Sequence, residues 1–191
     1  KAMRDVIERM KAGQVLVIAP EGTRSRTGAL IEGKPGVSYL AAKLGYPRDR
    51  IIGVWWAGSE EDVIPAGAAA TGYITAAFSS GGTNFPVMQE IVKKVYGAGK
   101  GNLEDKSRIG SMYHTRGVTY GIMIVEAIRQ AQAHFGKGKV MTPEQVRWGL
   151  EHIDLSEARL KALGAAGLFP PVKTSCADHE GSGMVKFQQW D

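Results

Sequence analysis

The chain of 191 residues is 43% hydrophobic and has a formal net charge of +5, which suits a folded domain with one sizeable core. Its charges are scattered along the sequence and form no block of like sign, which argues against a nucleic-acid-binding arm. No stretch approaches the roughly eighteen apolar residues of a membrane span, and the single cysteine, Cys176, cannot form an intramolecular disulfide.

The front of the chain alternates between helical and strand patterns. Apolar residues at helical spacing predict a first amphipathic helix that ends near Gly13. Two continuous apolar runs, at 15–19 and 51–55, predict strands that are buried on both faces of a parallel sheet. A polar loop at 20–36 and a helix ending near Gly45 separate them. The order strand, helix, strand predicts a right-handed parallel crossover of an α/β fold.

The rest of the chain continues the alternation of strands and helices. Thr142, Pro143 and Gln145 have the spacing of a capping box with proline in the first helical turn. Five further elements are predicted, in chain order: a strand at 72–78, a helix with an apolar stripe from Phe85 to Val95, a long helix at about 112–135, a short helix from Ser156 to Gly164, and a last strand at 184–190.

The loop after the first predicted strand reads Pro-Glu-Gly-Thr-Arg-Ser at residues 20–25, a composition that suits an anion-binding turn. Backbone N–H groups and the guanidinium of Arg24 can donate to phosphate oxygens, and Gly22 permits a close approach of the backbone. A basic turn at a sheet edge, without any ligand, accounts for the same residues.

This hexamer, with residues 32–37, resembles the third conserved block of the glycerolipid acyltransferases, which include 1-acylglycerol-3-phosphate acyltransferase. The resemblance covers about residues 10–47. In that family the general base is a histidine followed five positions later by an aspartate, and none of the four histidines here has an aspartate at that spacing. We therefore expect phosphate binding without catalysis. The resemblance implies that the phosphate-binding residues are Glu21, Gly22, Thr23 and Arg24.

Aromatic and acidic side chains follow the second predicted strand, where ligands of open α/β sheets bind. An amino-acid zwitterion needs a carboxylate for its ammonium group, hydrogen-bond donors for its carboxylate and apolar walls around its side chain. Tryptophans packed in a core and solvated acids explain the same composition. The residues concerned are Trp55, Trp56, Ser59, Glu60, Glu61 and Asp62.

Several separate motifs in the remaining sequence resemble branched-chain-amino-acid-type binding proteins of bacterial ABC importers. The resemblance covers about Tyr46 to Asp191. It implies a lobe of the periplasmic-binding-protein type, an α/β three-layer sandwich with a mainly parallel sheet. Such proteins have two lobes that close on a ligand and deliver it to an ABC permease. The matching segments, in order, are 53–72, 80–86, 113–129, 145–151 and 174–181.

This resemblance also implies a ligand site. By position, Trp56, Ser59 and Glu60 form one wall and Tyr113 another. We expect Glu60 to bind the ligand's ammonium group, with Glu61 as the second choice. Arg116 suits either the ligand's carboxylate or a salt bridge, and we expect the salt bridge.

A cluster near the C-terminus invites a metal-binding interpretation, but its spacing matches none of the usual structural zinc patterns. We expect a hydrogen-bonded turn and neither a metal nor a cofactor. The cluster consists of Cys176, Asp178, His179 and Glu180.

The two resemblances meet within residues 41–50. We expect an acyltransferase-like fragment at 1–47 and a periplasmic-binding-protein-like C-terminal lobe at 48–191, in a composite or truncated chain. The leading hypothesis is a non-enzymatic, incomplete amino-acid-binding component of an ABC importer. The alternative is a 1-acylglycerol-3-phosphate acyltransferase of phospholipid biosynthesis that lacks the catalytic pair of histidine and aspartate.

The expected partners are an amino acid and an ABC permease, or a glycerophospholipid headgroup at the front loop, and not nucleic acid. The resemblance implies a periplasmic or extracellular location, although no signal peptide opens this sequence.

Overall fold

The computed structural model describes residues 2–15, 17 and 50–191, and the chain divides into two compact units, Lys1–Ile51 and Ile52–Asp191. In the first unit, α1 (Ala2–Lys11) confirms the predicted amphipathic helix. The helix is followed by Gly13, whose φ of 78° needs glycine and whose N–H donates to the carbonyl of Met10. The predicted loop at 20–36 and the helix ending near Gly45 lie outside the described residues, as does most of the predicted strand at 15–19.

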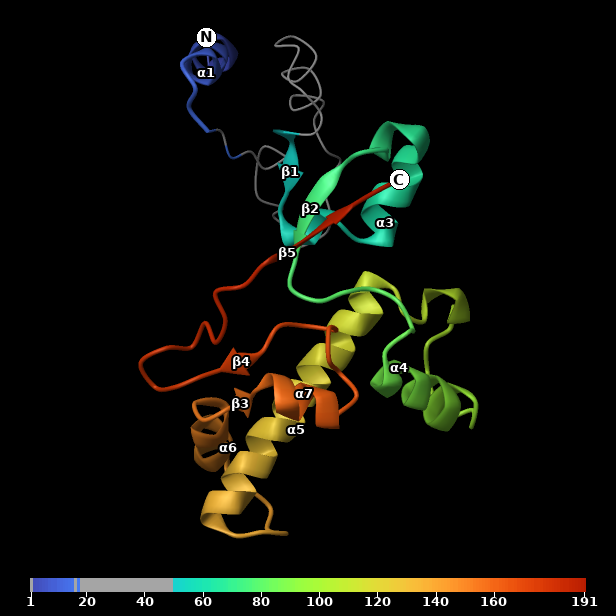
Figure 1. Cartoon of the computed structure of the whole chain (residues 1–191), viewed down its shortest axis with the longest axis vertical. Helices are drawn as coiled ribbons and strands as arrows, with labels where there is room; N and C mark the ends of the chain where they lie inside the picture. The colour runs from blue at the N-terminus through green and yellow to red at the C-terminus, as the bar shows by residue number, and fades with distance from the viewer. Residues whose placement is uncertain (1, 16, 18–49) are drawn as a thin grey trace. The chain divides into compact units, whose positions relative to one another are not determined.

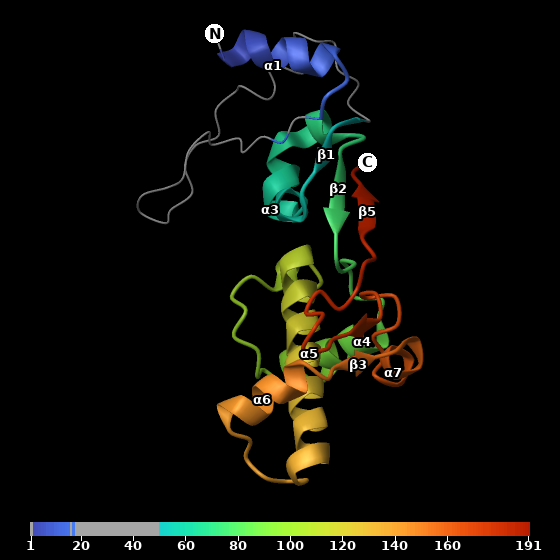
Figure 2. The same cartoon turned by 90° about the vertical axis from the view of Figure 1, so that its left-hand side faces the viewer.

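The second unit consists of short strands and helices around one long helix, α5 (Figures 1 and 2). Its elements are β1 (Ile52–Gly53), the 3-10 helix η2 (Trp55–Ala57), α3 (Glu60–Val63), the 3-10 helix η3 (Ile64–Ala70), β2 (Ile74–Ala77), α4 (Pro86–Ile91), the π-helix η4 (Val92–Tyr96), the 3-10 helix η5 (Lys106–Arg108), α5 (Met112–Phe135), α6 (Pro143–Leu150), β3 (Asp154–Leu155), α7 (Glu157–Ala162), β4 (Val172–Lys173) and β5 (Lys186–Gln189).

Two small sheets form in the second unit. The first has the order β1-β2-β5, with β1 parallel to β2 and β5 antiparallel to it. The second is the antiparallel pair of β3 and β4. Strands combined with helices confirm the α/β class. The first sheet is mixed in the described residues, and not mainly parallel, because the last strand of the chain runs against β2.

The prediction that the run at 51–55 is a strand buried on both faces is wrong. Only Ile52 and Gly53 pair with β2, and the chain then winds into η2. Ile52 is 58% exposed and Val54 57% exposed. In the described residues β2 is the single hydrogen-bonded neighbour of β1, so β1 is an edge strand and not a central strand of a parallel sheet.

Three predicted helices are confirmed, and each begins with a side-chain cap. Ser111 accepts from the N–H of His114 to begin α5, which ends before Gly136. Thr142 and Gln145 form the predicted capping box of α6, and Ser156 caps α7. These caps depend on residues three positions apart, which explains why the sequence reveals them.

The core of the second unit lies where α5 meets the segment from β3 to β4 (Figure 2). Leu155, Leu168 and Ala127 are fully buried there. Gly149 of α6 lets that helix approach α5 closely, because a Cβ at this position would lie 2.0 Å from the carbonyl oxygen of Ala127. The eight buried residues of this core are Ala127, Ile153, Leu155, Leu160, Ala165, Leu168, Phe169 and Val172.

One ion-pair network is buried beside this core. The side chain of Glu126 is 3% exposed and binds the guanidinium groups of Arg129, at 2.8 Å, and Arg159. Burial acts to raise the pKa of Glu126, but the hydrogen bonds from the two arginines outweigh it and hold that pKa below its ordinary value. The carboxylate therefore stays charged and links α7 to α5.

Candidate functional site

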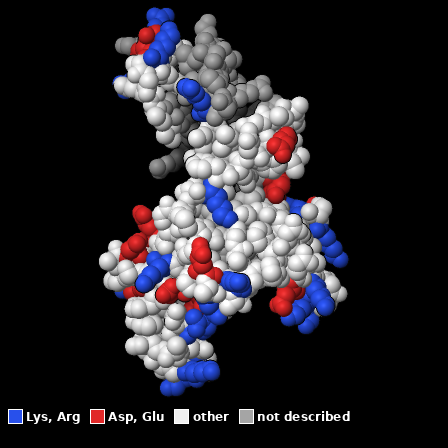
Figure 3. All heavy atoms as spheres, viewed as in Figure 1, with Lys and Arg blue, Asp and Glu red and all other residues white. Residues whose placement is uncertain are grey.

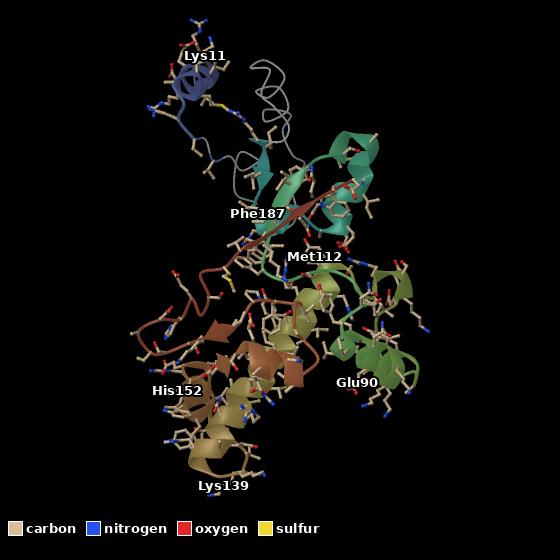
Figure 4. The ribbon with its side chains drawn as sticks, in the orientation of Figure 1. Lys11, Glu90, Met112, Lys139, His152 and Phe187 are labelled. Carbon is tan, nitrogen blue, oxygen red and sulfur yellow. The ribbon has the colours of Figure 1, made fainter. Side chains whose placement is uncertain are left out.

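The residues expected to bind ligand gather where η2 and α3 meet the first turns of α5. We call this region the rim and define it as residues 55–63 and 112–116. The backbone N–H of Met112 donates to Oε2 of Glu60 at 2.9 Å. Figure 4 marks Met112 at the end of α5 nearest the first sheet. A carboxylate is stabilised at the start of a helix, so Glu60 helps to hold α5 against α3.

The second expected acid, Glu61, has a different partner. Its Oε1 accepts a hydrogen bond from the guanidinium of Arg108. Burial acts to raise the pKa of Glu61, but its backbone hydrogen bond and the Arg108 guanidinium outweigh burial and hold that pKa below its usual value. Glu60, Glu61 and Arg108 line a hollow of about 560 Å³ together with the turn at Gly110 and Ser111.

The side chain of Ser59 is buried, at 1% exposure, and forms a hydrogen bond within the rim. Its hydroxyl donates to Oδ2 of Asp62 at 2.7 Å, and the same oxygen accepts from the phenol of Tyr113 at 3.5 Å. The Ser59 hydroxyl therefore orders the Asp62 carboxylate. Burial and the charge of the same carboxylate raise the pKa of Tyr73, the residue before β2.

The aromatic side chains of the rim surround Arg116. The rings of Trp55 and Trp56 stack with centroids 3.7 Å apart. The guanidinium carbon of Arg116 lies 4.5 Å from the Trp55 ring, 5.1 Å from the Tyr113 ring and 5.7 Å from the Trp56 ring. Its Nη2 also donates to the carbonyl of Trp55 at 3.1 Å. These are cation–π distances, so the arginine is held in place by rings and one carbonyl.

The structure thus brings the expected residues into one region, but it does not place them around one hollow. Glu60 and Glu61 line the 560 Å³ hollow, whereas Trp56 and Tyr113 flank Arg116, which lines a separate groove of about 820 Å³. The expectation of a salt bridge for Arg116 is wrong in the described residues, because its contacts are aromatic rings and a carbonyl. Trp56 is 60% exposed, so this tryptophan does not belong to the core.

Two other sequence-based expectations have different outcomes. The phosphate-binding residues Glu21, Gly22, Thr23 and Arg24 lie outside the described residues. The hydrogen-bonded turn around Cys176 is confirmed: Ser175 and Asp178 exchange backbone hydrogen bonds, and Oδ1 of Asp178 accepts from the N–H of Glu180 at 2.9 Å. Within the part of the chain that the structure describes, no group of three His, Cys, Asp or Glu side chains could hold a metal ion.

The sequence did not predict two contacts of the expected residues. Arg108, outside the rim, lies 47 positions after its partner Glu61, and the bond between Ser59 and Asp62 was not expected, although both residues were named. A sequence signal did exist for Asp62, since Ser59 and Asp62 have the three-position spacing of a capping box at the start of α3, although here the two side chains bond to each other and not to the backbone. No local signal pairs Arg108 with Glu61.

Comparisons with known proteins give matches of two kinds. The acyltransferase family model matches residues 1–55. An ABC transporter permease from the Pseudomonas fluorescens group is 44% identical, with a TM-score of 0.76 over 82% of this chain. The chain is thus similar to two kinds of protein.

A second solved structure has the same fold at lower identity. This branched chain amino acid ABC transporter from Thermus thermophilus, solved with bound valine, is 22% identical, with a TM-score of 0.56 over 82% of this chain. Both structures have the periplasmic-binding-protein-like fold, and the chain spans 38% and 39% of their respective lengths. A comparison with curated proteins gives no match.

None of the helices in residues 2–11 and 50–191 is both long enough and apolar enough to cross a bilayer. On the face drawn in Figure 3, Lys and Arg are mixed with Asp and Glu in small groups, with wide uncharged areas between them.

Proposed function

We propose that residues 52–191 are part of the amino-acid-binding component of an ABC importer, which works in the periplasm or outside the cell and passes its ligand to a permease. The 44% identity to an ABC transporter protein and the shared fold support this assignment to transport. The observation that carries the proposal is Arg116, a cation that is held by aromatic rings and lines an apolar groove.

The side chain of Arg116 is positioned to receive a carboxylate. A guanidinium has five N–H donors, and in the described residues one nitrogen, Nη2, donates to the Trp55 carbonyl. Tyr113 and Arg116 are three positions apart on α5, so they share a helix face. Because the rings fix the guanidinium before a ligand arrives, little side-chain entropy is lost when two parallel N–H···O bonds form with a carboxylate.

The exposed rings beside Arg116 suit the rest of an amino acid. Trp56 is 60% exposed and Tyr113 39% exposed, so each presents ring surface to a ligand. The aliphatic side chain of valine or leucine would lie against these rings while its carboxylate binds the guanidinium. An apolar wall with one well-placed polar group is the usual composition of a small-molecule site.

Glu60 is the proposed partner of the ligand's ammonium group. It lines a different hollow from Arg116, so this role requires the two hollows to join when the ligand binds. The Met112 N–H occupies Oε2, so the ammonium group would bind through Oε1. The substitution Glu60→Gln separates this role from the structural one. The amide oxygen of glutamine can still accept from Met112, while the negative charge that attracts an ammonium group is lost.

Saturation-transfer NMR with the full chain and valine tests the proposal, because the method detects dissociation constants in the millimolar range. We expect transfer to the valine methyl protons. Arg116→Gln should weaken binding about tenfold or more by removing a charge-assisted bidentate contact, and Glu60→Gln should weaken it by a smaller factor.

The matched control is Lys94→Gln, which removes one positive charge on η4 from an exposed ion pair with Glu90 of α4. It should bind valine like the parent chain, since an exposed pair contributes little to stability. Equal binding by the parent and Arg116→Gln, or no transfer from the parent chain, would show that the rim does not bind amino acids through this guanidinium.

The match of residues 1–55 to acyltransferases favours a second candidate function, acyl transfer to a glycerol phosphate lipid. Its assay is acyl transfer from a thioester to lysophosphatidate. Activity that Arg24→Gln abolishes would support this candidate in place of the first. The four histidines lie at positions 114, 134, 152 and 179, so residues 1–55 contain no histidine to act as a base.

A further inference from the structure

A serine and a lysine from distant parts of the chain meet at one end of the first sheet. Nζ of Lys186, the first residue of β5, donates to Oγ of Ser80 at 2.9 Å. Both side chains also donate to the carbonyl of Gly167, the serine at 3.2 Å. Neither residue belongs to the rim, and neither is among the site residues predicted from the sequence. Amino-acid transport therefore gives this pair no role.

Backbone contacts hold the serine and the lysine in place. Lys186 is opposite Ala77 in the antiparallel pairing of β5 with β2, so the chain that leaves β2 passes close to the lysine (Figures 1 and 2). The N–H of Ser80 donates to the carbonyl of Leu168 at 2.7 Å, which fixes the serine against the turn after α7. Leu168 is fully buried in the core, so this turn is itself anchored.

The contact between the two side chains has the geometry of a nucleophile and its base. A general base lies within about 2.6–3.2 Å of the atom whose proton it takes, and Ser80 Oγ is 2.9 Å from Lys186 Nζ. An amine is a base only when it is neutral. Partial burial lowers the pKa of Lys186 below its ordinary 10.5, which increases the neutral fraction. Serine with lysine is a recurring arrangement for acyl transfer.

A hollow of about 560 Å³ lies beside the pair. Lys186 and Gly167, the two partners of the Ser80 hydroxyl, both line it. An apolar wall with a few polar groups is the usual composition of a small-molecule site. The hollow therefore suits the apolar acyl group of an ester. Its apolar walls are formed by Leu160, Phe169, Pro170, Pro171, Met184 and Val185.

The backbone after the serine can stabilise the charge that develops on an ester carbonyl. In serine hydrolases with a nucleophile in a turn after a strand, the N–H of the following residue donates to the developing oxyanion. Here that residue is Gly81, which is exposed and whose N–H has no acceptor in the described residues. This N–H is available to a substrate, and the glycine leaves space for one.

We propose that Ser80 and Lys186 form a catalytic pair that hydrolyses esters of short apolar carboxylic acids. Neutral Lys186 takes the hydroxyl proton as Ser80 Oγ bonds to the carbonyl carbon, and the Gly81 N–H donates to the oxyanion. The bond from this carbon to the alcohol oxygen then breaks, and Lys186 returns the proton to the leaving alkoxide. Water attacks the acyl-serine by the same route and releases the carboxylic acid. This activity is independent of the proposed role in transport.

Hydrolysis of p-nitrophenyl butyrate by the full chain tests the proposal, with the absorbance of p-nitrophenolate as the readout. Ser80→Ala should lower the rate about a hundredfold or more, because the nucleophile is lost. Lys186→Arg should lower it by a similar factor. Arginine keeps the positive charge and can still donate to Ser80 and Gly167, but it cannot be deprotonated to act as the base.

Two further measurements separate catalysis from a structural role for Lys186. Because the base is the neutral amine, the rate should rise with pH and level off above a pKa that lies below 10.5. A fluorophosphonate probe should phosphonylate Ser80, with loss of fluoride, in the parent chain and not in Lys186→Arg. Mass spectrometry of the peptides locates the label.

The matched control is Lys173→Arg, the same change at an exposed lysine on β4 outside the hollow, and its rate should equal that of the parent chain. Circular dichroism establishes that each variant folds. A parent chain that neither hydrolyses the ester nor takes the label would overturn the proposal. So would a label on another residue, or a Lys186→Arg variant as active as the parent chain.

Discussion

One face of α5 carries apolar side chains in two different surroundings. Tyr120, Ile124, Ala127 and Ala131 follow one another at spacings of three and four positions, so they share that face. Ala127 and Ala131 are fully buried where α6 packs on the helix, whereas Tyr120 is 51% exposed and Ile124 52% exposed. The apolar pattern of a helix states which positions can be buried, whereas the neighbouring elements decide which of them are buried. Substitutions in the covered and uncovered parts of the face should therefore have different costs.

The largest difference is expected for the removal of large apolar side chains. Leu168 is fully buried in the core, so Leu168→Ala should lower the free energy of unfolding by about 3 kcal/mol through lost burial and a residual cavity. Ile124→Ala in the uncovered part of the face should change it by less than about 0.5 kcal/mol. Urea unfolding followed by circular dichroism measures both. Similar losses at the two positions would mean that the chain alone already buries the uncovered part.

A smaller difference is expected for the same change at two glycines. Gly149→Ala places a Cβ 2.0 Å from the Ala127 carbonyl oxygen and should destabilise the protein by about 2 kcal/mol, because α5 and α6 must separate. Gly121→Ala meets no atom within 4 Å and should stabilise the chain by about 0.5–1 kcal/mol through helix propensity. Thermal melts compare the two variants, and a stabilised Gly149→Ala would contradict the close packing of α5 on α6.

The smallest effect concerns the pH dependence of the first turn of α5. The N–H of Gly110 donates to Nδ1 of His114, whose Nε2 lies 2.8 Å from the hydroxyl of Tyr96. Burial lowers the pKa of His114 below its ordinary 6.5. The unfolded chain therefore binds the proton first as the pH falls, and stability is present above pH 6.5 and lost as the pH falls through the lower, folded value.

The substitution His114→Gln removes this titration. Urea midpoints measured from pH 8 to pH 5 should fall less steeply in the variant than in the parent chain. Parallel curves would indicate that the neutral ring of His114 contributes nothing to the folded state, and that other groups cause any loss of stability in this range.

Local sequence signals predicted the helices of the second unit well. The bounds of α5 and the capping box of α6 follow from hydroxyl, amide and glycine residues within three or four positions of each helix end. The turn around Cys176 was predicted for a similar reason, because Ser175 and Asp178 are close in the chain. The resemblance to binding proteins rested on the order of several such segments, and the solved structures confirm it.

The site was only partly predictable. The sequence placed Trp56, Glu60 and Tyr113 in one region, and the structure brings them to the rim. It could not show that Glu60 receives the Met112 N–H, since these residues are 52 positions apart. Nor could it show that Arg116 has aromatic rings as partners in place of a carboxylate.

What the sequence by itself determined about this protein is the type and order of its helices and the division into two resemblances, because caps, periodicity and motifs are properties of neighbouring residues. The tertiary structure alone decided that Ile52 and Ile124 are exposed, that Arg116 is held by aromatic rings and that part of one face of α5 is open. Burial and hydrogen-bond partners depend on segments distant in the chain, and an apolar pattern does not state which segments those are.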